Sequence, residues 1–353
     1  MIGQHLMVGF RGTVVTPEFR KFLEANDIGG VVLFAENCRT LSQIQNLTAA
    51  LSSVKTSATL LIAIDHEGGR VHRLPEPFTH FPPAARIGAA SEKNPETSWA
   101  FEVGKAMALE LSAAGIHLDF APVLDVWTNP SNQVIADRAF GNTVERVSRL
   151  GIQMIQGLQE HGVAACGKHF PGHGDTDADS HETLPRLAHN FRRIETLEVI
   201  PFRQAVSAGV ASLMTAHVVY NGYDRGLPAT LSVKTLRDLL RTQYGFAGVV
   251  FSDDLEMKAI TNLMPMEEAA VAALLAGCDS LLVGRNLDAQ ERVVARLRRA
   301  VASREIPPPL FHGAAQRIAR LKKTYCRSPE KRPPASVIGS AEHRKLASLL
   351  QSV

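Results

Sequence analysis

The sequence predicts an α/β protein built as a single (β/α)8 TIM-type barrel with a short C-terminal helical tail. Short apolar runs recur along the chain, helix-period segments lie between them, and polar residues gather where the runs end. Continuous apolar strands that alternate with amphipathic helices are typical of a parallel sheet covered by helices. The eight runs lie at 5–10, 28–34, 59–65, 116–121, 163–168, 211–217, 248–253 and 279–284.

Helix-period segments fill most of the intervals between these runs. Ser232 is placed to cap one of them and Gly245 to end it. Eight strands in 353 residues fit a closed barrel. An open doubly wound sheet stays the alternative, although no glycine fingerprint for a dinucleotide follows the first run. The predicted helices lie at 17–25, 41–54, 99–114, 144–161, 197–208, 234–244 and 266–276.

The composition of the chain changes near its end. After about residue 326 the sequence becomes polar and rich in proline, and it then closes on a helix-period segment at 342–350. We therefore expect the barrel to cover residues 1–327. Residues 328–353 are expected to form a tail with one helix rather than a second domain.

Composition and charge argue against several classes of protein. Apolar residues make up 45% of the chain and charged residues 21%, which is typical of a globular protein with a sizeable core. The net charge is only +3 and no basic run is interleaved with aromatics, so nucleic acid is not an expected partner. No stretch approaches the roughly twenty apolar residues of a membrane span. The first residues lack the basic region of a signal peptide, so we expect a cytoplasmic protein without membrane contact.

The four cysteines do not form a recognisable framework. They lie far apart and none belongs to a C-x-x-C pair, so neither a disulfide framework nor a cysteine zinc site is expected. Two of them, Cys166 and Cys278, stand in apolar runs where a thiol acts as a small buried hydrophobe.

Polar residues stand at the carboxyl ends of at least five predicted strands. In (β/α)8 barrels this end carries the active site, because the loops that follow the strands gather there. The sequence therefore predicts one pocket into which side chains from distant segments converge. These residues are Asp65, Lys168 and His169, His217, Asp253 and Asp254, and Arg285, and the fourth run is followed by Asp125.

The loop after the fifth run, residues 168–181, holds the densest set of titratable groups. Within it Asp179 stands two residues before His181, so the carboxylate can bond one ring nitrogen while the other exchanges protons. By spacing alone, a solvated polar loop explains the pattern as well. A calcium loop does not fit, because Ser180 and Arg186 stand where glycine and the bidentate glutamate belong.

A metal site made of histidines from this loop is a further alternative. The imidazoles of His169, His173 and His181 could bind a metal together with an aspartate. No H-E-x-x-H is present, and the proline and glycine between the first two histidines favour an irregular turn over a helix face. We expect no metal and no cofactor.

Two adjacent carboxylates, Asp253 and Asp254, end the seventh run. Successive strand residues point to opposite faces, so one can face the pocket while the other caps the following helix. A carboxylate on a rigid strand end can attack an electrophilic carbon and form a covalent ester. Two capping or loop aspartates would explain the pattern equally well.

The segment at 65–73 also follows an apolar run. Its paired glycines allow close approach of a ligand, and Asp65 and Arg73 offer an acceptor and a donor for sugar-like hydroxyls. Acidic residues before the glycines and the absence of G-K-[ST] argue against a phosphate cradle. The imidazole of His217 could equally face the pocket or pack at a strand end.

Taken together, these segments resemble the family 3 glycoside hydrolases, in the bacterial β-N-acetylglucosaminidase branch. The likeness covers roughly residues 1–325, and K-H-F-P-G-H-G with a downstream S-D-D is its most specific part. Departures at His66, Ala139 and Glu256 leave fine specificity open. The matching segments are 65–73, 115–126, 137–141, 168–176, 179–181, 214–217 and 248–255.

The resemblance implies retaining cleavage of a terminal β-linked N-acetylglucosamine. It implies that Asp253 is the nucleophile and that His181, partnered by Asp179, is the acid/base. It assigns sugar binding to Asp65, Arg73, Arg138, Lys168 and His169.

The resemblance also implies a small carbohydrate substrate. For this branch the expected substrates are muropeptide fragments in which N-acetylglucosamine is linked to anhydro-N-acetylmuramic acid, and a monomer is expected. Other activities stay open: another exo-β-glycosidase of β-glucosidase type, or a phosphorylase that uses phosphate in place of water. A sugar-binding protein that keeps the barrel without catalysis is the alternative from another class.

Overall fold

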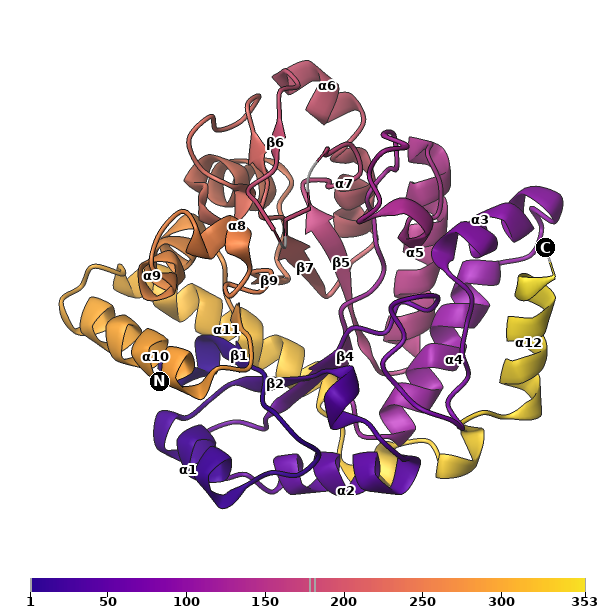
Figure 1. Cartoon of the computed structure of the whole chain (residues 1–353), viewed down its shortest axis with the longest axis horizontal. Helices are drawn as coiled ribbons and strands as arrows, with labels where there is room; N and C mark the ends of the chain where they lie inside the picture. The colour runs from indigo at the N-terminus through magenta and orange to yellow at the C-terminus, as the bar shows by residue number, and fades with distance from the viewer. Residues whose placement is uncertain (1, 178, 181, 353) are drawn as a thin grey trace.

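Eight parallel strands form one sheet that closes on itself, as the sequence predicts (Figure 1). The computed structural model describes residues 2–177, 179–180 and 182–352. The sheet runs in the order β10-β1-β2-β3-β4-β5-β7-β9, and a parallel bridge from Phe251 to Ser280 joins its two edges. The strands are β1 (Leu6–Val8), β2 (Gly30–Leu33), β3 (Leu61–Ile64), β4 (Leu118–Asp119), β5 (Ala164–Phe170), β7 (Ser212–Thr215), β9 (Val249–Phe251) and β10 (Leu281–Val283).

The strands are apolar on both faces because the barrel is packed inside and outside. In β2, Val32 belongs to the cluster that fills the barrel, whereas Val31 and Leu33 pack among the residues that face the helices. This burial on both sides explains why the strands are continuous apolar runs without polar alternation. Each of the eight predicted runs overlaps one strand, and β5 extends two residues beyond its run at 163–168.

Helices surround the barrel in chain order (Figure 1). Several begin at side-chain caps: the hydroxyl of Thr16 accepts from the Phe19 amide, and the side chain of Asn286 accepts from the Ala289 amide. The helices of the ring are α1 (Pro17–Asn26), α2 (Leu41–Ser52), α3 (Ala84–Lys93), α4 (Trp99–Ala113), α5 (Val144–Glu160), α6 (Phe191–Thr196), α7 (Ile200–Ser207), η5 (Lys234–Gln243), α8 (Lys258–Thr261), α9 (Met266–Ala276) and α10 (Leu287–Ala302).

All seven predicted helices are present, with one difference of type. The segment at 234–244 is a π-helix, in which the amide of Tyr244 donates to the carbonyl of Leu239. The Ser232 hydroxyl accepts from the Thr235 amide as predicted, and Gly245 has a φ of 67° directly after the helix.

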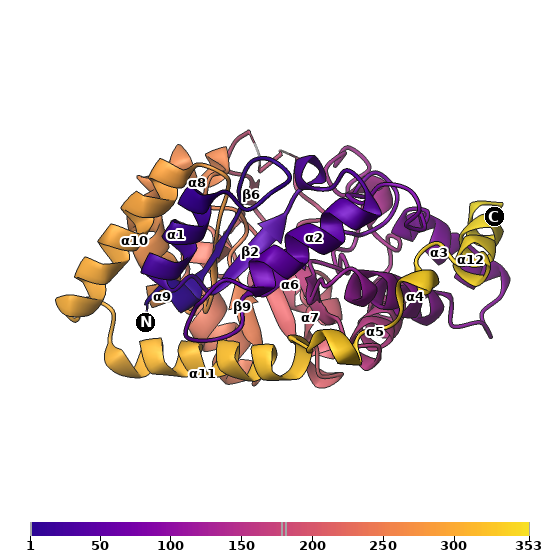
Figure 2. The ribbon, with the colours of Figure 1, turned by 90° about the horizontal axis from the view of Figure 1, so that it is seen from below.

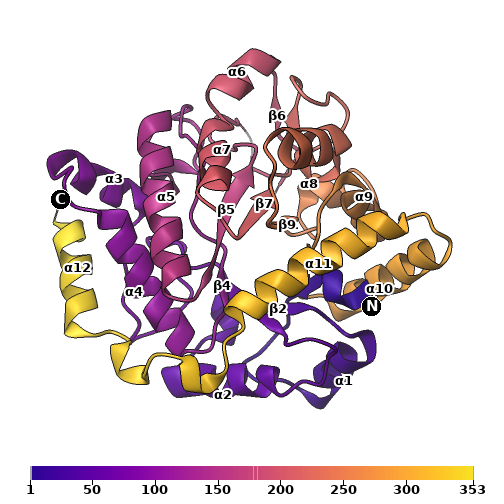
Figure 3. The same cartoon turned by 180° about the vertical axis from the view of Figure 1, so that it is seen from behind.

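Helix α11 (Pro308–Tyr325) closes the end of the barrel opposite the loops that follow the strands (Figures 2 and 3). Its Ile318 and Leu321 belong to the cluster that fills the barrel. The ammonium of Lys322 donates to Oε1 of Gln4, just before β1, over 2.7 Å. A ligand would therefore approach the barrel from the other end.

The C-terminal segment folds back along the ring. After the short turns η6 (Pro329–Lys331) and η7 (Ala335–Val337), helix α12 (Ala341–Gln351) packs against α3 and α4 (Figure 3). In α4, the buried carboxylate of Glu110 accepts from the Gly339 amide over 3.0 Å and lies 2.7 Å from Nδ1 of His343. The division of the chain at residue 327 stays a prediction.

Within the described part of the chain, no helix is both long and apolar enough to cross a bilayer.

All four cysteines are free thiols, and Cys166 and Cys278 are buried as predicted.

Candidate active site

A cavity of about 720 Å³ lies at the carboxyl ends of the strands, where the sequence predicts the site. Seven of the eight predicted site residues line it, from elements far apart in the chain. The eighth, His181, lies outside the described residues. The convergence of distant strand ends is therefore confirmed, whereas the role of each residue stays a prediction. The seven lining residues are Asp65, Arg73, Arg138, Lys168, His169, Asp179 and Asp253.

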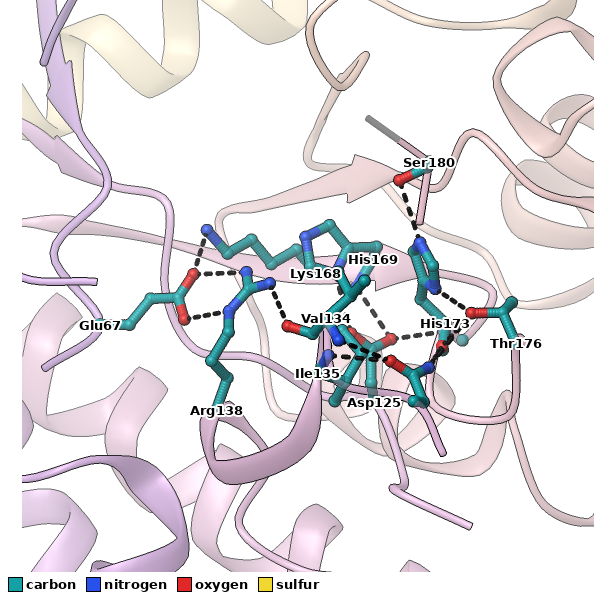
Figure 4. A network of polar contacts seen from close by, with 12 residues as sticks. Glu67, Asp125, Val134, Ile135, Arg138, Lys168, His169, His173, Thr176 and Ser180 are labelled. Carbon is teal, nitrogen blue, oxygen red and sulfur yellow. Dashed lines mark hydrogen bonds and ion pairs between the residues drawn. The ribbon is translucent and has the colours of Figure 1, made fainter. Parts of the chain in front are cut away.

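A network of ion pairs joins two of these cations to carboxylates that follow β3, near the neighbouring strands β4 and β5 (Figure 4). The Nζ atom of Lys168 lies 2.6 Å from Oδ1 of Asp65 and 2.7 Å from Oε1 of Glu67. The guanidinium of Arg138 donates to both oxygens of Glu67 over 2.8 Å. Such bidentate pairing fixes the orientation of the guanidinium and strengthens the ion pair.

These pairs keep the network ionised although it is buried. Burial alone would lower the pKa of Lys168, but the carboxylates of Asp65 and Glu67 outweigh it and raise that pKa above its usual value. Burial alone would raise the pKa of Glu67, yet Arg138 and Lys168 hold it far below its usual range. A rigid pattern of charges therefore faces the cavity.

A second network positions His169. Nδ1 of its ring lies 2.8 Å from Oδ2 of Asp125, and its backbone amide donates to Oδ1 of the same carboxylate over 3.1 Å (Figure 4). In the neutral ring this contact places the proton on Nδ1 and leaves Nε2 as the nitrogen with a lone pair. Asp125 therefore sets both the orientation and the tautomer of a cavity residue.

The same carboxylate also anchors the loop that carries Asp179. Oδ1 of Asp125 accepts from the amide of His173 over 2.7 Å. The ring of His173 lies 2.8 Å from the Thr176 hydroxyl through Nδ1 and 3.1 Å from the Ser180 hydroxyl through Nε2 (Figure 4). Burial, helped by the neighbouring His169, lowers the pKa of His173 to about 4. A neutral His173 therefore fastens the loop on both sides of Asp179.

The two carboxylates that end the seventh strand are held differently. Oδ1 of Asp253 accepts from the Asp254 amide over 2.8 Å. Oδ1 of Asp254 accepts from the amides of Glu256 and Gly284, each over 3.0 Å, so it ties the turn after β9 to the end of β10. Burial, with the charges of Glu256 and Asp253, raises the pKa of Asp254 to about 7. Both side chains line the cavity.

The imidazole of His217 is packed at its strand end and is not part of the cavity wall. Its Nδ1 lies 2.7 Å from the Thr230 hydroxyl, and its Nε2 lies 3.1 Å from the carbonyl of Asp254. The side chain is fully buried. Of the two interpretations that the sequence left open, the structure favours the packed one.

Two charged residues of the site were not assigned a role from the sequence. Glu67 stands between the predicted binding residues Asp65 and Arg73, but its pairing with Arg138 depends on a fold that brings position 67 to position 138. Arg285 was noted at a strand end; its guanidinium lies 4.8 Å from the Phe34 ring centre and pairs with Glu36 over 2.5 Å.

Comparison with known proteins points to one family. A family model described as the glycosyl hydrolase family 3 N terminal domain matches residues 1–321. A protein named β-hexosaminidase from Nitrosospira multiformis is 40% identical over 294 residues, which cover 83% of each chain. Another of that name, from Chromobacterium violaceum, is 39% identical over 319 residues, covering 90% of this chain and 86% of the relative.

Solved structures give the same result. A family 3 β-N-acetylglucosaminidase from Paenibacillus superposes with a TM-score of 0.92 at 36% identity, covering 99% of this chain and 67% of that one. NagZ from Neisseria gonorrhoeae, in complex with N-trifluoroacetyl-D-glucosamine, superposes with a TM-score of 0.82 at 33% identity, covering 99% and 97%. The resemblance in the motifs is thereby confirmed, and the chain belongs to glycosyl hydrolase family 3.

Proposed function

We propose that this protein is an exo-acting, retaining β-N-acetylglucosaminidase. The observation that carries the proposal is that Asp253, Asp179 and the cations Lys168 and Arg138 line one cavity at the carboxyl end of the barrel. The other end of the barrel is closed by α11, so a single sugar residue would enter the cavity from the carboxyl end of the strands. The β-hexosaminidase names of the relatives support the same activity.

Asp253 is proposed as the nucleophile. It follows β9 directly, and a strand end is a rigid support for an attacking carboxylate. Its oxygen would bond to C1 of the sugar while the bond from C1 to the leaving oxygen breaks, giving a covalent glycosyl-enzyme. Water would then attack C1 from the opposite side, so the product keeps the β configuration.

His181 is proposed as the acid/base, with Asp179 as its partner. In the first step the protonated imidazole would give its proton to the departing oxygen, and in the second step the neutral ring would take a proton from water. A nearby carboxylate stabilises the protonated ring and orients the neutral one. His173 contacts Thr176 and Ser180, and so anchors the loop on both sides of Asp179.

The remaining cavity residues are proposed to bind the sugar. Asp65 can accept from a hydroxyl, whereas Lys168, Arg138 and Arg73 can donate, and the ordered ring of His169 adds one more polar contact. Apolar side chains in the same wall would suit the methyl group of an N-acetyl substituent. They are Phe34, Val71, Met214, Met257 and Leu282.

The aglycone is proposed to be acidic, as in fragments with N-acetylglucosamine linked to anhydro-N-acetylmuramic acid. The guanidinium groups of Arg70 and Arg285 also line the cavity and would attract a carboxylate, although each already pairs with an acidic side chain, Asp137 and Glu36 respectively. We further propose a monomer that acts in the cytoplasm on such cell-wall fragments. Free thiols at all four cysteines are in keeping with a reducing compartment.

The test is the rate of aryl glycoside cleavage, measured with and without inorganic phosphate. We expect turnover of aryl N-acetyl-β-glucosaminides that phosphate does not accelerate, with release of free N-acetylglucosamine. Faster turnover of aryl β-glucosides would favour a β-glucosidase. Release of a sugar 1-phosphate that requires phosphate would establish a phosphorylase, and binding without turnover would overturn the enzymatic proposal.

A further inference from the structure

We propose that Asp175, His189 and Glu198 form a binding site for one divalent transition-metal ion of zinc type, outside the catalytic cavity. Each residue offers one donor atom, and these atoms lie within 4.8 Å of one another. None of the three lines the catalytic cavity. The proposal goes beyond the proposed glycosidase chemistry, which uses a carboxylate and an imidazole.

The spacing of the donors suits an ion after a small rearrangement. Donors in a zinc site stand ~2.0–2.2 Å from the metal, so donor atoms are separated by roughly 3–4 Å. Nε2 of His189 contacts Oδ2 of Asp175, so these two donors would move apart to admit the ion, and the third donor comes from Glu198. One imidazole nitrogen with two carboxylate oxygens is a set that leaves a coordination position open to water.

The carboxylate of Glu198 is the observation that points to a cation. Only 2% of this residue is exposed. Its Oε1 accepts from Nε of Arg193 over 3.1 Å, but its Oε2 is buried and has no hydrogen-bond partner among the described residues. A buried carboxylate oxygen without a partner is costly, and a metal ion would satisfy it.

Neighbouring groups would orient the ligands. The Thr128 hydroxyl donates to Oδ1 of Asp175 over 2.5 Å, which leaves Oδ2 directed at His189. Hydrogen bonds of this kind to the non-ligating atom support metal ligands in general. The backbone at Gly172 packs closely against Glu198, because a Cβ added to Gly172 would lie 2.9 Å from the Cβ of Glu198.

The site would connect the loop of the catalytic dyad to the helical ring. Asp175 stands four residues before Asp179, His189 follows β6 (Arg186–Leu187), and Glu198 lies between α6 and α7. An ion held by all three would fasten both ends of the segment 175–189 to the start of α7. Its expected effect is a more rigid loop, without a part in bond cleavage.

The experiment is a titration of the chelator-treated full-length protein with zinc chloride, followed by calorimetry, and with cobalt chloride, followed by visible absorption. We expect one ion per chain and cobalt bands of a site with nitrogen and oxygen ligands. Glu198→Gln and His189→Gln should weaken binding at least about tenfold. Glu160→Gln and His312→Gln, which change exposed side chains elsewhere, should bind as the wild type does.

Hydrogen exchange separates this site from the catalytic cavity. Zinc should slow amide exchange in residues 175–189 of the wild type and have no such effect in Glu198→Gln, whose folding is checked by near-ultraviolet circular dichroism. The proposal is overturned if no ion binds, or if Glu198→Gln and His189→Gln bind as tightly as the wild type. It is also overturned if Asp179→Asn, rather than these variants, abolishes binding.

Discussion

Lys168 and Asp65 form an ion pair of 2.6 Å that links β5 to the end of β3, two strands away in the barrel. Their positions are 103 residues apart in the chain. The lysine side chain is 2% exposed and the aspartate 25% exposed, so the pair is buried on one side and open to the cavity on the other. One contact therefore both ties two strand ends together and shapes the wall of the cavity.

Lys168→Met should destabilise the protein strongly. The change leaves the buried carboxylate of Glu67 with one of its two cations, and breaking a buried pair costs about 3–5 kcal/mol. Urea denaturation measures the loss. Lys105→Met is the matched control, because its pair with Glu102 is exposed and is worth about 0.2–1 kcal/mol. Equal losses in the two variants would contradict the account of the network.

His181→Ala should slow substrates with poor leaving groups far more than activated aryl glycosides. A general acid contributes roughly 100-fold or more only where the departing oxygen needs a proton. Measured kcat for a natural-type disaccharide and for a nitrophenyl glycoside gives the comparison. Asp179→Asn should show the same pattern more weakly. Equal losses on both substrates would argue against an acid/base role for this loop.

Asp254→Asn should change how stability depends on pH. The pKa of Asp254 is raised to about 7 by burial and by nearby carboxylates, so the folded protein binds this proton more tightly than the unfolded chain. The protonated Asp254 carboxyl makes its whole stabilising contribution to the free energy of unfolding below about pH 4. That contribution is lost as the pH rises through about 7. The loss is on the order of 4 kcal/mol.

The measurement is the free energy of unfolding at pH 5 and pH 8 for the wild type and Asp254→Asn. The asparagine side chain does not titrate. The free energy of unfolding of the variant, relative to that of the wild type, should therefore be higher at pH 8 than at pH 5. Asp288→Asn, on the first turn of α10, is the control. A difference between variant and wild type that is the same at both pH values would refute the prediction.

Exhaustive chelation should leave the glycosidase activity intact. The proposed chemistry uses a carboxylate and an imidazole, and the proposed ion between Asp175, His189 and Glu198 takes no part in it. The measurement is kcat before and after treatment, with zinc added back. Activity that disappears on chelation and returns with zinc would revive a metal-assisted mechanism.

The strands and the location of the site could be predicted because each depends on local pattern. Strands buried on both sides are apolar runs, and parallel strands in a barrel place their carboxyl ends together, so Asp65, Lys168 and Asp253 were expected to meet. The partners of those residues could not be predicted. The pairing of Glu67 with Arg138, and of His173 with Ser180, depends on loop conformations that spacing does not determine.

Helices α3, α6, α8, α10 and α11 likewise lie outside the predicted segments. Helix α11 packs Ile318 and Leu321 under the barrel, and its place there is set by contacts with segments at the start of the chain such as Gln4. The π-type geometry of η5 is a second example, because the apolar spacing at 234–244 predicts a helix without defining its type. Tertiary packing decides both.

The most direct test of the central claim is to trap the glycosyl-enzyme and locate the bond. The protein would be treated with a fluorinated N-acetylglucosaminyl fluoride that slows the second step, digested, and mapped by mass spectrometry. The account predicts one sugar ester on the carboxylate of Asp253 and none in Asp253→Ala, which should still bind substrate but not turn it over. A sugar on Asp254 or on another residue, or full turnover by Asp253→Ala, would contradict it.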